Sequence, residues 1–170
     1  MKKILTAIMG MAFMAGTAHG VLIGQGTREL AVQGDMQFAS EVGTAFEIDL
    51  RLGQFVIHGV QVGILASVAD NDIATQWGIG AFTEYNVDLG TELVPFAGLA
   101  AKYSYLDPDV GDSNDGAVFG AAAGVKYFFA ENIAISLNYL FEWATDDVFR
   151  DKEEAEDTNH SIQLGMRFFF

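Results

Sequence analysis

The chain has 170 residues, and its 23 acidic and nine basic side chains give a formal net charge of −14 at pH 7. Nucleic acid is excluded as a natural partner, because binding phosphates requires clustered Lys and Arg. The absence of cysteine excludes disulfides and thiolate metal sites. Hydrophobic residues make up 51% of the chain, so their spacing has to show what they cover.

Residues 1–20 resemble a secretory signal peptide rather than part of a fold. Lys2 and Lys3 precede the apolar run 4–15, and small residues follow up to Gly20. A run of about a dozen apolar residues is too short for a spanning helix, which needs roughly 20. We therefore expect cleavage before Val21 and a mature domain of residues 21–170.

The mature chain is a succession of segments in which apolar and polar residues alternate. Period two over such lengths predicts β-strands with one apolar and one polar face. The pattern is clearest over residues 133–143, whose length matches the roughly 9–11 residues that a tilted strand needs to cross a bilayer. The eight predicted strands lie near residues 30–38, 46–52, 56–68, 73–87, 93–105, 117–129, 133–143 and 161–170.

The predicted connections alternate between tight and long, as in an up-and-down meander. Tight links are expected near residues 53–54, 88–90 and 130–132. Longer links are expected at residues 39–44, 69–72, 106–116 and 144–158. Pro95, which cannot donate a ladder hydrogen bond, is expected at the start of the fifth strand.

The charged residues favour a barrel with lipid outside over a water-soluble, lipocalin-like barrel. They fall on the polar faces of the strands, beside many glycines, and include both signs. Such a mixture suits a narrow lumen that side chains fill, with the charges paired. We expect a structural lumen network, with coupling between Lys126 and Glu142. Its members are Glu47, Glu84, Lys102, Lys126, Glu142 and Arg167.

The signal peptide, the eight alternating segments and the ending Leu164-Gly165-Met166-Arg167-Phe168-Phe169-Phe170 resemble the OmpA/OmpX-type outer-membrane barrel family. The resemblance implies an all-β, eight-stranded antiparallel transmembrane barrel in the bacterial outer membrane. It also implies that Phe168 and Phe170 form an assembly signal read by the barrel-assembly machinery. The surrounding partners would be outer-membrane lipid and lipopolysaccharide, and the barrel would be a monomer.

The adjacent residues His160 and Ser161 are the candidate catalytic pair. Some eight-stranded outer-membrane enzymes modify lipid A acyl chains with a Ser, a His and a carboxylate. Successive strand residues point to opposite faces, so these two side chains cannot easily share a proton. We predict no enzymatic site, no cofactor and no metal. His58 is expected to be an interfacial residue on the apolar face of the third strand.

Two acidic stretches remain. Residues 107–116 have the oxygen ligands that calcium prefers but not the register of an EF-hand, since Asp112 replaces the turn glycine and Val118 the bidentate Glu. Residues 146–157 contain seven acidic side chains and resemble a solvated loop. Either could meet divalent cations, lipopolysaccharide or another extracellular partner.

The sequence therefore predicts an outer-membrane barrel with a structural or surface-interaction role in the envelope. A narrow ion-conducting pore is the first alternative, and a lipid A acyl-modifying enzyme is the second.

Overall fold

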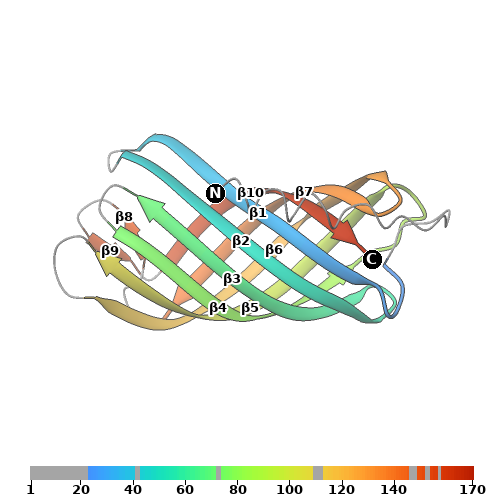
Figure 1. Cartoon of the computed structure of the whole chain (residues 1–170), viewed down its shortest axis with the longest axis horizontal. Coiled ribbons are helices and arrows are strands. Elements are labelled where there is room, and N and C mark those ends of the chain that lie inside the picture. The colour runs from blue at the N-terminus through green and yellow to red at the C-terminus, as the bar shows by residue number, and fades with distance from the viewer. Residues whose placement is uncertain are drawn as a thin grey trace.

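The computed structural model describes residues 23–40, 43–71, 74–108, 113–145, 149–151, 154–156 and 158–170. These residues form a closed antiparallel barrel of eight long strands (Figure 1). Its strands are β1 (Arg28–Ser40), β2 (Gly43–Ile57), β3 (Val60–Asn71), β4 (Ala74–Asn86), β5 (Leu93–Pro108), β6 (Asn114–Ala130), β7 (Ile133–Ala144) and β10 (Thr158–Phe169). Among the described residues, no helix combines the length and the hydropathy needed to span a bilayer.

The strand order around the barrel is β1-β10-β7-β6-β5-β4-β3-β2. Consecutive long strands are therefore neighbours, and β10 closes the barrel against β1. We call the end where β1 begins and β10 stops the terminal end, and the opposite end the distal end. The predicted eight-stranded up-and-down barrel is confirmed.

The distal end carries an element that the sequence pattern did not predict. Within the stretch expected to be one loop, β8 (Phe149–Asp151) and β9 (Glu154–Glu156) pair as a separate two-stranded sheet. The strands β5 and β6, with 16 and 17 residues, are also longer than expected and longer than a bilayer crossing requires.

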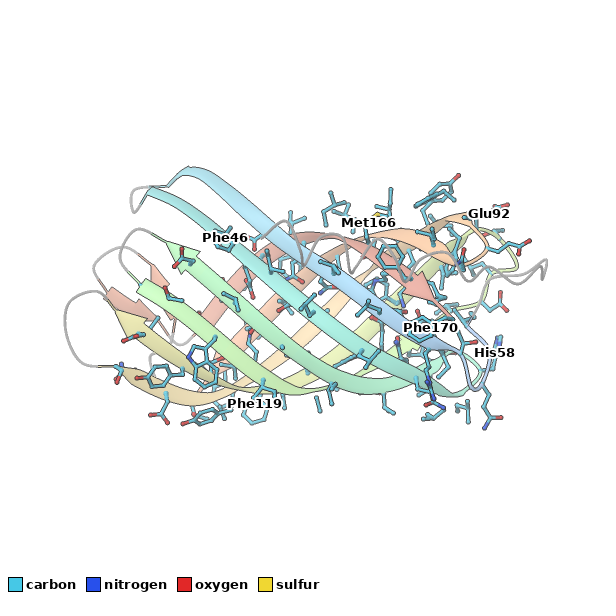
Figure 2. All side chains as sticks on the ribbon, in the orientation of Figure 1. Phe46, His58, Glu92, Phe119, Met166 and Phe170 are labelled. Carbon is cyan, nitrogen blue, oxygen red and sulfur yellow. The ribbon has the colours of Figure 1, made fainter. Side chains whose placement is uncertain are left out.

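The barrel is inverted in polarity relative to a water-soluble protein. Large apolar side chains cover its outside, with Ile162 at 67% exposure, while polar and charged side chains fill its inside. Figure 2 shows Phe119 and Met166 pointing away from the barrel. A water-soluble barrel would place its apolar faces inside, so the lipocalin-like alternative is wrong and the outer face suits lipid.

Outward-facing aromatic side chains gather near both barrel ends, as in the interfacial girdles of transmembrane barrels. Near the distal end, Trp77 lies 5.4 Å from Tyr105 and Phe119 lies 5.8 Å from Trp143, measured between ring centroids. Tyr85 and Phe170 lie toward the terminal end.

The predicted tight link at residues 53–54 is wrong. The strand β2 continues to Ile57, and the turn lies at His58 and Gly59, where Gly59 has a φ of 76°. The pattern misled because polarity reverses at this end of β2: Gln54 faces outward and Phe55 is fully buried inside. His58 therefore lies in a turn, where its Nε2 is 3.2 Å from Asp88 Oδ2.

Phe55 belongs to an apolar plug that closes the lumen at the terminal end. Phe169, the one large apolar residue on the polar face of the last strand, packs at 4.8 Å from Phe128 and 6.5 Å from Phe55 between ring centroids. The Ile23 carbonyl accepts a hydrogen bond from Gly59 N. The plug consists of Ile23, Phe55, Val94, Phe128, Ala134 and Phe169.

Candidate lumen site

The lumen contains buried ions supplied by seven different strands. Each ionic side chain is placed there by the alternation of its strand, which turns every second residue inward. Glycines on the same face leave room for these long side chains: an added Cβ at Gly80 would lie 2.6 Å from Lys102 Cα. The resulting ion pairs form two groups at different depths.

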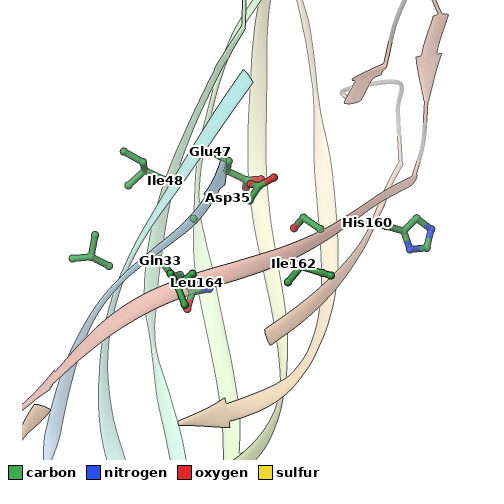
Figure 3. Close-up of a pocket in the computed structure, with 10 residues that line it drawn as sticks. Gln33, Asp35, Glu47, Ile48, His160, Ile162 and Leu164 are labelled. Atoms are coloured by element: carbon green, nitrogen blue, oxygen red, sulfur yellow. The ribbon is translucent and has the colours of Figure 1, made fainter. Parts of the chain in front are cut away.

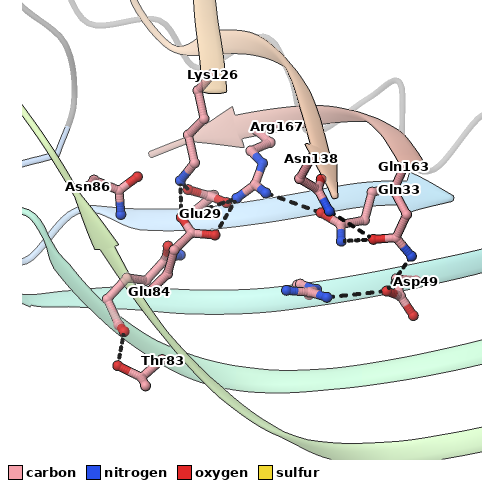
Figure 4. Close-up of polar contacts among 12 residues, drawn as sticks. Glu29, Gln33, Asp49, Thr83, Glu84, Asn86, Lys126, Asn138, Gln163 and Arg167 are labelled. Carbon is pink, nitrogen blue, oxygen red and sulfur yellow. Dashed lines mark hydrogen bonds and ion pairs between the residues drawn. The ribbon is translucent and has the colours of Figure 1, made fainter. Parts of the chain in front are cut away.

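The first group, which we call the inner cluster, comprises Glu29, Glu84, Lys126 and Arg167 (Figure 4). Lys126 Nζ lies 2.8 Å from Glu29 and also pairs with Glu84. Arg167 Nη1 lies 2.7 Å from Glu29 and 3.1 Å from Glu84. Two cations and two carboxylates thus cross-pair, and no member exceeds 2% exposure.

The inner cluster lies against the apolar plug and the neighbouring ring of Phe96. Lys126 Nζ lies between 5.2 and 5.9 Å from the ring centroids of Phe96, Phe55 and Phe169. The Arg167 guanidinium lies 4.6 Å from the Phe96 centroid. Cations over ring faces are attracted by the π electrons, most strongly where water is excluded. Charge neutralisation and ring contacts together compensate for burying these ions.

The second group, which we call the outer group, comprises Glu47, Asp49, Arg51, Lys102 and Glu142. Lys102 Nζ lies 2.7 Å from Glu142 and 3.8 Å from Glu47. Arg51 Nη2 lies 3.3 Å from Asp49. Here three carboxyl groups share two cations, which gives the outer group a formal charge of −1.

Amides join the two groups into one network. Arg167 Nη2 donates to Gln33 Oε1 at 3.1 Å, and Gln33 Nε2 donates to Gln163 Oε1 at 2.8 Å. Gln163 Nε2 reaches Asp49 at 3.4 Å, while Asn138 donates to Gln163. Figure 4 shows this chain of contacts running along the wall from the inner cluster.

The structure places all six sequence-predicted lumen residues inside the barrel, but their partners differ from the expected pair. Lys126 contacts Glu29 and Glu84, whereas Glu142 contacts Lys102. The reason is the register of β6 with β7, which pairs Lys126 with Ser136 and Glu142 with Gly120 and so sets the two side chains at different depths. Sequence reasoning also omitted Glu29 from the network, although its position on the polar face of β1 was the available signal.

The pair His160 and Ser161 lies on opposite sides of the barrel wall, as strand alternation predicts. His160 is exposed outside, where its Nδ1 hydrogen-bonds with the Tyr139 hydroxyl, and Ser161 is buried inside. In the described part of the chain, no group of three or more acidic or His side chains could hold a metal ion. Residues 109–112, and the side chains of the run 146–157, lie outside what the structure describes.

Known proteins share this architecture. The N-terminal β-barrel domain of Pseudomonas aeruginosa OprF is 16% identical, covers 86% of this chain and 99% of that chain, and gives a TM-score of 0.64. Neisserial surface protein A (NspA) is 16% identical over 84% of this chain and 94% of that chain, with a TM-score of 0.59. Ail, the attachment invasion locus protein of Yersinia pestis, is 10% identical over 86% and 99%, with a TM-score of 0.51.

These low identities establish the fold alone, and a comparison with curated proteins found no match. The family is established by sequence: the model of the outer membrane protein beta-barrel domain matches residues 4–168. With the closed eight-stranded barrel and the expected OmpA/OmpX-type resemblance confirmed, the chain belongs to the outer membrane β-barrel domain family and lies in the bacterial outer membrane.

Proposed function

We propose that this protein is a closed barrel with a structural or surface-interaction role in the envelope, rather than a pore. The observation that carries the proposal is the inner cluster on the plug, where four paired ions with at most 2% exposure fill the lumen at the terminal end. Eight strands enclose a space that side chains can fill. In this family's architecture the short turns are periplasmic, so the distal end would face outward.

The role would then be performed by the outer surface and the distal loops. Partners consistent with this proposal are outer-membrane lipid and lipopolysaccharide around a monomeric barrel, and an extracellular partner at the acidic stretches 107–116 and 146–157. Their charge would suit a cationic surface or bridging divalent cations.

A planar bilayer experiment tests the closed lumen. Full-length protein reconstituted at known density should give no steady conductance at voltages where a wide porin, added as a positive control, shows channels. Stepwise channels with a reproducible conductance would support the pore alternative instead.

Deletion of the gene tests the envelope role. The deletion strain should become more sensitive to bile salts and large antibiotics, and complementation should restore resistance. The lipid A acyl pattern, measured by mass spectrometry in the same strains, should not change; an acyl difference restored by complementation would favour the enzymatic alternative.

A further inference from the structure

The barrel seam between β1 and β10 is paired over only part of its length. The register runs from Glu29↔Phe169 to Gly34↔Leu164 and stops there. Beyond it, β1 remains paired with β2, and β10 remains paired with β7 up to Thr158↔Trp143. Across this seam, residues 36–40 of β1 and 158–162 of β10 have no partner in this register, and we call this stretch the open seam.

The open seam exposes backbone hydrogen-bonding groups within the wall. At the terminal end, Arg28 and Phe170 exchange two backbone hydrogen bonds, of 2.8 and 2.9 Å. Every second pair of an antiparallel ladder does so, and the same register would next place such pairs at 36 with 162 and 38 with 160. Unsatisfied backbone groups are costly in lipid, so a polar ligand group is favoured here.

A cavity of about 690 Å³ lies at the open seam (Figure 3). Its outward rim is apolar and continuous with the lipid-facing surface, through Ile48, Ile162 and Leu164. Its inward rim is polar, through Asp35, Glu47 and Ser161. Ser161 is 7% exposed, and its Oγ has no hydrogen-bond partner among the described residues.

The inward rim favours a cation. The ion pair of Glu47 is long, since Lys102 Nζ lies 3.8 Å from its carboxylate. The same Nζ lies closer to the Glu142 carboxylate, at 2.7 Å. Asp35 adds a second carboxylate to the same wall. A primary ammonium has three donors and no acceptor, which matches the carboxylates, the Ser161 hydroxyl and backbone carbonyls beyond the end of the β1–β10 register.

We propose that the open seam binds an amphiphile from the bilayer that has one alkyl chain and a primary ammonium head group. The chain lies against Ile48, Ile162 and Leu164, while the head group enters the lumen beside Glu47. An anionic amphiphile of the same chain length is repelled by the carboxylates, so charge and not chain length selects the ligand.

Nuclear magnetic resonance on the full-length protein in phosphatidylcholine nanodiscs tests the site. Dodecylammonium should give saturable amide shifts at Ile48 and Ile162, whereas Ile79 on the opposite wall should not move. Dodecyl sulfate and dodecyl maltoside should give no saturable shifts. Equal responses to all three amphiphiles, or no saturable response to dodecylammonium, would overturn the proposal.

A matched pair of variants isolates the carboxylate. Glu47→Gln should weaken dodecylammonium binding at least tenfold. Glu92→Gln, which removes one carboxylate from an exposed link at the terminal end, should leave the affinity unchanged. Equal weakening in both variants would indicate an effect of overall charge and contradict a site at Glu47.

A cross-seam disulfide tests the location. Positions 37 and 161 would face each other if the seam closed in the register of its paired part. The chain has no cysteine, so the double variant Gln37→Cys with Ser161→Cys can form only this one disulfide. The oxidised protein should bind dodecylammonium less tightly than the same variant after reduction. Equally tight binding by the oxidised protein would refute the seam as the site; if the disulfide does not form, the Glu47→Gln comparison decides the proposal alone.

Discussion

Lys126 is fully buried, yet its ammonium is surrounded by two carboxylates and three aromatic rings. Removing one partner from a buried ion pair is strongly destabilising because it leaves an uncompensated charge. Without the Lys126 ammonium, the buried carboxylates of Glu29 and Glu84 would have only one cation, Arg167, between them.

Lys126→Met should therefore lower the free energy of unfolding by about 3–5 kcal/mol. Urea unfolding of the barrel in detergent micelles, followed by tryptophan fluorescence, measures the change. Arg28→Met, at an exposed position at the start of β1, is the control and should stay within about 0.5 kcal/mol of the wild type. A similarly small effect of Lys126→Met would show that the inner cluster does not stabilise the barrel.

Double-mutant cycles should separate the observed partners from the sequence-predicted pair. Lys126→Met combined with Glu84→Gln should show a coupling energy above about 1 kcal/mol, as residues in one ion-pair network do. Lys126→Met combined with Glu142→Gln should be additive within about 0.5 kcal/mol. Strong coupling in the second cycle would contradict the division into an inner cluster and an outer group.

At the scale of the strands, glycine positions on the lumen face differ in how closely the neighbouring strand approaches. A Cβ at Gly80 of β4 would lie 2.1 Å from the Ala101 carbonyl oxygen of β5. A Cβ at Gly120 of β6 would have its nearest neighbour at 3.5 Å, an ordinary contact with Leu140. The first position thus requires glycine, and the second has space for a methyl group.

Gly80→Ala should lower the free energy of unfolding by about 1–3 kcal/mol, because backbone must shift to admit the methyl group. Gly120→Ala should be neutral or slightly stabilising, because alanine restricts the unfolded chain more than glycine does. The two midpoints of urea unfolding, measured side by side, test the difference, and a larger loss for Gly120→Ala would contradict the packing described.

The elements were predictable where each strand face meets a single environment along its length. Residues 133–143 alternate in polarity, except at Ala134 and Leu140 on the lumen face, because one face contacts lipid and the other the lumen. The alternation failed at Phe55, where the lumen face becomes apolar in the plug, so the turn was placed too early. The hairpin of β8 and β9 was missed because short strands in a charged loop leave no hydrophobic period.

The members of the lumen network were predictable from strand parity, but their pairing was not. The alternation along each strand predicts that Lys126 and Glu142 both point inward, but the depth of each side chain depends on the register between strands. Glu29 and Lys126 are far apart in sequence and come together only through closure of the whole sheet. The open seam depends on where one register stops, and no local pattern records that.

At the scale of the whole molecule, the side chain and the backbone of Phe170 have different surroundings. The Phe170 side chain is 56% exposed at the outer face, while its backbone is hydrogen-bonded to Arg28 irrespective of the side chain. A change at this side chain should therefore affect recognition during assembly more than the folded barrel.

Phe170→Ala should reduce the amount of protein in the outer membrane several-fold, if the terminal aromatic is the proposed assembly signal. Spontaneous folding of the purified chain into detergent micelles should be unaffected, as judged by the shift in gel mobility between unboiled and boiled samples. Ile162→Ala, another exposed apolar position of β10, is the control and should accumulate normally. Equal losses of both variants would argue against a specific signal.

Closure of the barrel joins the two ends of the chain. Glu29 stands in the first strand and Arg167 in the last, and their 2.7 Å contact lies within the seam that unites β1 with β10. Contacts between such distant residues form late, because the entropy cost of closing the long intervening loop comes before the contacts can stabilise the fold. The inner cluster thus fastens the first strand to the last: until β10 joins β1, Glu29 and Glu84 share Lys126 alone, and only Arg167 of the final strand brings the second cation that balances the two buried carboxylates.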